Sequence, residues 1–131
     1  TNNITVINNT LASYSILHNP ENWLEAGSTP QLVRFKRPGK YDISVYASVE
    51  RTTGSNSMVS IEFNSASTSS SVKDFIDLPG GLTAVSSSIG RGLITVVNDE
   101  EFKLDYNRLA EATANSNHNL KQLIVIIRVM E

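Results

Sequence analysis

The sequence contains no cysteine, which excludes disulfide bonds, thiolate metal ligands and cysteine nucleophiles. It also has little net charge, because 11 basic and 13 acidic residues leave a balance of -2. A protein that binds nucleic acid is expected to carry a basic stripe, and this balance argues against one. The longest apolar run, residues 123–127, is far too short to span a membrane. We therefore expect a soluble domain with no nucleic-acid partner and no membrane insertion.

Histidine is scarce as well, with only His18 and His118 in the chain. Both lie in Asn-rich stretches that we expect to be exposed, and no Gly-x-Ser-x-Gly motif accompanies them, so neither a serine triad nor a zinc site is indicated. Asp74 and Asp77 could supply paired carboxylates for glycosidase chemistry in principle. No second feature supports that chemistry, so we expect no enzyme activity and no cofactor.

The chain has 131 residues, a length that suits one domain with its own core. It begins Thr1-Asn2-Asn3, without an initiator Met and without a signal peptide. We interpret residues 1–131 as a single domain from the C-terminal part of a longer protein.

What is abundant is Ser, Thr and Asn, a usage that favours strands and turns over long helices. Residues 41–50 alternate strictly between apolar and mostly polar side chains, which predicts a strand with one apolar face. Further strands are predicted at residues 4–7, 13–17, 31–35, 58–63, 72–78, 82–89, 93–97, 102–106 and 120–130. Turns separate them, and we predict a turn or a bulge at Gly90-Arg91-Gly92 and a long loop at 109–119. This pattern predicts an all-β, two-sheet sandwich.

The last predicted strand carries apolar side chains in both directions. One face holds Leu123, Val125, Ile127 and Val129, and the other holds Ile124, Ile126 and Met130. Exposing the second face would lose about 1.5–3 kcal/mol of burial free energy per side chain and leave an apolar patch that promotes association. Packing around a threefold axis would cover it, and so would the loop at 109–119. We favour the homotrimer, with an interface formed by Tyr46, Leu123, Ile124, Ile126 and Met130.

Three segments resemble one family of jelly rolls. Residues 35–45 resemble the Phe-x-x-Pro-Gly-x-Tyr strand entry of the tumour-necrosis-factor-like and complement globular-head domains. Residues 94–104 resemble that family's strand-turn-strand segment, although its usual Gly-Asp pair is Asn98-Asp99 or Asp99-Glu100 here. Residues 123–129 look like the closing strand of bacteriophage fibre tips and spikes with this fold.

The resemblance covers residues 31–131 and implies a ten-stranded, two-sheet jelly roll that assembles as a homotrimer. Members of the family recognise receptors, glycans or partner proteins through loops and grooves between subunits. Some bind calcium, and as a rule they do not catalyse reactions.

The candidate binding residues are an out-of-place aromatic and several polar loop residues. Trp23 is either a sugar-stacking platform or a cap on the core. Tyr46 lies on the otherwise polar face of its strand, where it contacts a neighbouring subunit, a ligand or the rim of the second sheet. Three polar loops, 51–56, 64–71 and 114–119, suit hydrogen bonding to hydroxyl groups. The binding residues we select are Trp23, Tyr46, Arg51, Asn56, Asn64 and His118.

Asp99, Glu100 and Glu101 are three consecutive acids at a predicted turn. They form either a solvated turn or, because hard cations prefer clustered carboxylates, a calcium site. Apart from that alternative we expect no metal.

Together these features predict a receptor-binding head of a phage or viral fibre or spike. It would lie on the virion surface or outside the cell and recognise a cell-surface glycan or protein through the loops of a trimer. The alternative is a structural trimerisation or capping domain of a fibre or bacterial surface protein, without a ligand of its own.

Overall fold

The computed structural model describes residues 3–10, 13–18, 22–53, 57–78, 84–111 and 117–130, which form ten strands. None of the described residues forms a helix that could span a membrane. The strands are β1 (Asn3–Thr10), β2 (Ser13–His18), β3 (Leu24–Ala26), β4 (Leu32–Phe35), β5 (Gly39–Thr53), β6 (Ser57–Ser65), β7 (Ser71–Leu78), β8 (Ala84–Val96), β9 (Glu101–Glu111) and β10 (Asn117–Met130).

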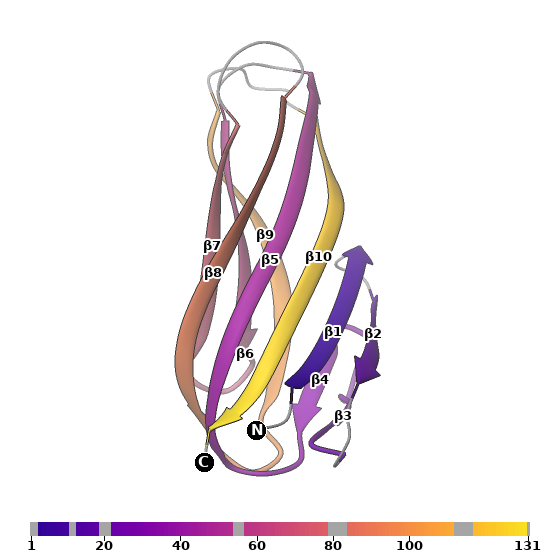
Figure 1. Ribbon diagram of the computed structural model, residues 1–131, viewed down its shortest axis with the longest axis vertical. Coiled ribbons are helices and arrows are strands. Elements are labelled where there is room, and N and C mark those ends of the chain that lie inside the picture. Colours follow the sequence, from indigo (N-terminus) through magenta and orange to yellow (C-terminus); the bar gives the residue numbers. More distant parts are fainter. Residues whose placement is uncertain are drawn as a thin grey trace.

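The strands form two antiparallel five-stranded sheets that pack face to face (Figure 1). The β5/β10 sheet has the order β2-β1-β10-β5-β8, and the β6/β9 sheet has the order β3-β4-β9-β6-β7. This is the jelly-roll sandwich that the sequence predicts, since alternating strands bury one face of each sheet against the other.

The core lies between the sheets and comes from the inward positions of the alternating strands. On β5 these are Tyr41, Ile43, Val45, Ala47 and Val49, all with no exposed surface. An aromatic cluster fills the end near the β4–β5 connection, where the Phe35 ring lies 4.9 Å from Tyr41 and 5.1 Å from Phe102. The Tyr41 hydroxyl donates a hydrogen bond to the carbonyl of Arg37 at 2.7 Å, which ties the core to that connection.

Two positions beside strand ends have a positive φ. Gly39, which follows Pro38 and begins β5, has a φ of 149°, which a residue with a side chain rarely adopts. Asp99, in the predicted Asn-Asp turn, has a φ of 61°, a left-handed value that Asp and Asn tolerate better than other residues.

The prediction of a turn or a bulge at Gly90-Arg91-Gly92 was wrong, because β8 runs through all three residues and pairs with β5 there without a shift in register. The two sheets meet along β7 and β8, which lie side by side (Figure 1). A Cβ atom on Gly90 would lie 2.1 Å from the carbonyl oxygen of Lys73 on β7. Glycine is therefore present for close approach between strands and not for a turn.

The prediction of a loop at 109–119 was wrong at both ends of that range. Residues 109–111 belong to β9, and residues 117–119 belong to β10. The antiparallel order places the strand ends Thr53, Ser57, Leu78, Ala84, Glu111 and Asn117 at one end of the sandwich. The connections 66–70 and 97–100 lie at the other end. The described parts of the predicted binding loops 51–56 and 114–119 thus lie at one end, and 64–71 lies at the opposite end, whereas 54–56 and 114–116 lie outside the described residues.

Candidate functional site

The outer face of the β5/β10 sheet carries most of the exposed large apolar side chains of the described residues. Leu93 and Ile89 on β8 are 70% and 64% exposed. Ile126 and Met130 on β10 are exposed as well. Several exposed large apolar side chains on one sheet face are typical of interaction surfaces.

Strand register makes this face continuous. Tyr46 on β5 lies opposite Ile89 on β8 and opposite Ile124 on β10, so three large side chains form one row across the sheet. Side chains at directly opposed positions lie about 5 Å apart at Cβ, close enough for contact. Tyr46 therefore continues an apolar row and is not an isolated ring on a polar face.

A charged cluster lies in the middle of the same face. The Asp42 side chain is almost fully buried, and Arg91 donates to both of its oxygens, with Nε at 2.9 Å and Nη2 at 2.5 Å. Arg128 approaches the same carboxylate at 3.9 Å. The hydrogen bonds from Arg91, helped by the charge of Arg128, lower the pKa of Asp42 below its ordinary value. One carboxylate thus faces two guanidinium groups.

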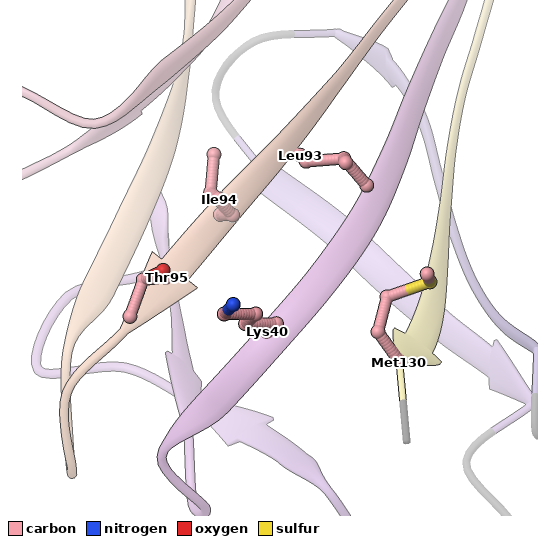
Figure 2. Close-up of a pocket in the computed structure, with 5 residues that line it drawn as sticks. All are labelled: Lys40, Leu93, Ile94, Thr95 and Met130. Atoms are coloured by element: carbon pink, nitrogen blue, oxygen red, sulfur yellow. The ribbon is translucent and has the colours of Figure 1, made fainter.

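A pocket of about 240 Å³ opens at the end of this face near the β10 C-terminus. Its lining comes from β5, β8 and β10, as Figure 2 shows, and consists of Lys40, Leu93, Ile94, Thr95 and Met130. Lys40 forms no ion pair with a described residue. The pocket could accept an apolar side chain with a nearby acceptor.

Four of the five residues predicted for a trimer interface lie on this outer face, namely Tyr46, Ile124, Ile126 and Met130. Leu123 is different, because its side chain points inward and has no exposed surface. Its inclusion was wrong, since neighbouring residues of a strand face opposite sides. Ile126 and Met130 are exposed, so no described part of residues 109–119 covers them.

Arg51 was predicted as a loop residue that binds a ligand, but it is completely buried in β5. Its Nη1 donates to the Ser57 hydroxyl at 3.2 Å and to the carbonyl oxygen of Leu78. The prediction failed because β5 extends to Thr53, and Arg51 shares the inward parity of Val49. That parity was the signal in the sequence that identifies it as an interior residue.

His118 was expected to be exposed, and it is half-buried on β10. Its Nε2 lies 2.9 Å from the Ser57 hydroxyl, and its ring lies 6.4 Å from that of Tyr106. A hydroxyl beside an imidazole is a pair that nucleophilic catalysis uses. Here the hydroxyl is buried and also accepts a hydrogen bond from Arg51, which suits a contact that joins strands. The pair comes from residues 61 positions apart, so local sequence could not reveal it.

Trp23 packs against the core rather than lying free on the surface. Its ring meets Tyr41 edge-on at 6.2 Å, and the Arg37 guanidinium lies 4.4 Å from the ring centre. One face of the indole is therefore already covered by a cation. This arrangement fits the core-capping alternative.

Asn64, another predicted binding residue, lies on β6 in the outer face of the β6/β9 sheet. It is thus remote from His118, which lies at the opposite end of the sandwich. Asn56 lies outside the described residues, as do 114–116 of the third candidate loop. The structure does not bring the predicted binding residues into one site.

The three acids of the predicted turn diverge. Glu100 is buried, and it accepts hydrogen bonds from Ser65, from Thr68 at 2.8 Å and from the Val97 amide at 2.9 Å. Glu101 accepts hydrogen bonds from Ser28 and Arg34, and Asp99 remains exposed. No group of three potential metal ligands occurs among the described residues. Calcium binding by these acids thus gains no support from their geometry.

Asp74 and Asp77, the candidate carboxylate pair, lie on opposite faces of β7. Asp74 is buried near Ser88, and Asp77 is exposed. Burial raises the pKa of Asp74, although a hydrogen bond from Ser88 partly opposes the shift. Two carboxylates that face away from each other cannot act together on one glycosidic bond.

No family model matches the sequence, and no curated protein matches it. Solved structures do match the fold. The globular domain of zebrafish complement 1qA protein aligns with a TM-score of 0.59 at 11% identity, covering 98% of this chain and 97% of that one. Murine APRIL at pH 5.0 aligns with a TM-score of 0.62 at 10% identity, covering 98% and 100%.

These similarities confirm the tumour-necrosis-factor-like, complement-head-like jelly roll that the sequence resemblance implied. At 10–11% identity they show the fold alone. Neither protein is from a phage or virus, so the phage connection gains no support from them.

Proposed function

We propose that this domain associates with itself as a homotrimer through the outer face of the β5/β10 sheet and serves as a receptor-binding head. The observation that carries the proposal is the apolar face itself, formed by Ile89, Leu93, Ile126 and Met130 around the row of Tyr46. Burying one such side chain contributes about 1.5–3 kcal/mol, so leaving all of them in water is costly. A second copy of the chain is the partner that is always available to cover them.

A further feature supports the same face. The pocket beside Lys40 can receive an apolar side chain from a neighbouring copy. A threefold arrangement is what the family resemblance implies, and a head-to-tail contact that closes into a ring needs no other partner.

The receptor-binding role rests on the fold and on the polar connections at the ends of the sandwich. We propose a cell-surface glycan or protein as the receptor, and a location outside the cell or on a virion surface. The setting in a phage or viral fibre or spike rests on the resemblance of residues 123–129 alone.

Light scattering of the purified domain tests the assembly. We expect a molar mass near three times 14.3 kDa. Leu93→Asp should give monomers, because a carboxylate on the apolar face would lose its water on association. Val97→Asp is the matched control, because Val97 is 55% exposed but lies in the β8–β9 turn. A monomeric wild-type domain at high concentration would refute the proposal.

The second candidate is a structural trimerisation module, and the apolar face favours it equally because assembly needs no ligand. Binding of the trimer to host cells or to an array of glycans separates the two functions. A trimer that binds neither cells nor glycans would be a capping domain.

A further inference from the structure

Phe75 lies on the outer face of the β6/β9 sheet and is 54% exposed. It comes from β7, directly opposite Ser60 on β6, which lies opposite Asn107 on β9. Apart from the half-buried Met58, the other outward positions nearby carry polar or charged side chains, while the core-facing positions of β7 are occupied by Val72, Asp74, Ile76 and Leu78. The ring therefore serves neither the core nor the apolar face of the other sheet, and its exposed surface is available to a ligand.

Fixed polar groups lie beside the ring. Glu62 accepts hydrogen bonds from the Ser60 hydroxyl at 2.9 Å and from Nδ2 of Asn107 at 2.7 Å, and Lys73 lies 3.5 Å from its carboxylate. These contacts hold the carboxylate in one orientation, which lowers the entropy lost when a ligand binds. The Asn64 side chain also hydrogen-bonds to Glu62. The acceptor site that these hydrogen bonds leave on the carboxylate and the side-chain carbonyl of Asn107 can accept further hydrogen bonds.

A second fixed pair continues along the same face. Asn64 donates to Asp105 at 2.7 Å and accepts from the Ser71 hydroxyl at 2.5 Å. Asp105 also lines a hollow of about 260 Å³ at the side of β9, together with Gln31, Lys103, Leu104 and Tyr106. The aromatic ring, the two fixed pairs and the hollow lie on adjacent strands of one sheet.

The charged side chains on this face limit the class of ligand that it can bind. Lys73 lies near Glu62 and Lys103 lies 3.8 Å from Asp105, so these charges offset each other. Asp77, also outward on β7, adds one negative charge. A site with a small negative balance disfavours sialic acid and phosphate.

We propose that this face binds a neutral oligosaccharide, with the apolar side of one pyranose ring on Phe75 and hydroxyls of that ring and of a neighbouring sugar unit on Glu62, Asn107 and Asp105. Aromatic faces pack well on the C–H side of a sugar ring, and planar amide and carboxylate groups match pairs of hydroxyls. The inference deepens the proposed receptor-binding role and rests on it, but it uses the opposite face of the sandwich from the proposed subunit interface. Association of copies through the β5/β10 sheet would leave this face open.

The test is binding of the full domain to an array of neutral hexose oligosaccharides and sialylated oligosaccharides, followed by titration of the strongest neutral one. Phe75→Leu keeps an apolar side chain but removes the ring, and we expect it to weaken binding about tenfold. Phe75→Trp is the matched control and should retain binding. Glu62→Ala should weaken binding by a similar factor, about tenfold, through lost hydrogen bonds to hydroxyls.

Melting temperature and molar mass are measured on the same samples. The inference stands if binding falls in Phe75→Leu and Glu62→Ala while both quantities stay near the wild-type values. It is overturned if no neutral saccharide binds, if only sialylated ones bind, or if Phe75→Leu binds as tightly as the wild type. A monomer that binds neutral saccharide would refute the trimer and leave this inference intact.

Discussion

Arg91 forms a two-point ion pair with Asp42 across neighbouring strands, with Nη2 2.5 Å from Oδ2. Most of the Arg91 side chain is exposed, whereas that of Asp42 is almost fully buried. The pair therefore brings a charged group into an apolar face without leaving the carboxylate unsatisfied. The stability of the domain should depend on pH through this carboxylate.

Asp42→Asn should reduce the free energy of unfolding by about 1 kcal/mol at pH 7. Because Arg91 lowers the pKa of Asp42 in the folded state, the ionised carboxylate stabilises the fold above its ordinary pKa of 3.8. That contribution is lost as the pH falls through the lower, folded value. Urea denaturation from pH 7 to pH 2 at one protein concentration measures it. Glu50→Gln is the control, because Glu50 meets Lys121 only at 3.6 Å on the surface.

Asp74→Asn should have the opposite effect. Burial raises the pKa of Asp74, so the folded state disfavours its charged form at neutral pH. This cost is full above the raised pKa and disappears as the pH falls below the ordinary value of 3.8. We expect the variant to gain about 1 kcal/mol of stability at pH 7 and none near pH 3. An equal difference at both pH values would contradict the explanation.

Gly90→Ala should destabilise the sandwich by about 2–3 kcal/mol, since its new methyl group would meet the backbone of β7. Gly92→Ala is the matched variant, because the nearest atom there is a Val72 methyl at 3.2 Å, which can move. We expect a cost under about 1 kcal/mol at Gly92. Thermal unfolding of both variants measures the difference. Similar losses of stability would show that β7 and β8 can move apart to accept the methyl group.

Arg51→Met should cost about 2–4 kcal/mol, since it removes the buried donor to Ser57 and to the Leu78 carbonyl. Arg51→Lys keeps the charge but lacks the planar fork, so it should recover only part of that loss. Denaturant titration compares the three proteins. Full recovery by lysine would mean that charge alone matters at this position.

Much of the fold follows from local patterns. The alternation along β5 predicts its inward face, and a turn appears at Asn98-Asp99, where the sequence predicts one. Fold class depends on such patterns because each strand must bury one face. Local patterns gave the wrong structure at Gly90. Glycine is needed there because β7 of the other sheet packs too closely for a side chain.

The site was harder to predict because its parts come from separate strands. Arg91 and Asp42 are 49 residues apart, and register alone brings them together. The sequence did indicate that Ile126 and Met130 face away from the core, which the structure confirms. It could not indicate that Phe75, Glu62 and Asn107 share one face, since that depends on which strands are neighbours.

Glu100 joins the two described connections at one end of the sandwich. Its carboxylate accepts hydrogen bonds from Ser65 and Thr68 in one connection and from the Val97 amide in the other. A peptide inserted between residues 65 and 68 would therefore disturb the turn at 97–100 as well. A change of sequence in one of these connections therefore affects the other. A new binding specificity at this end of the molecule would need coordinated changes in both connections.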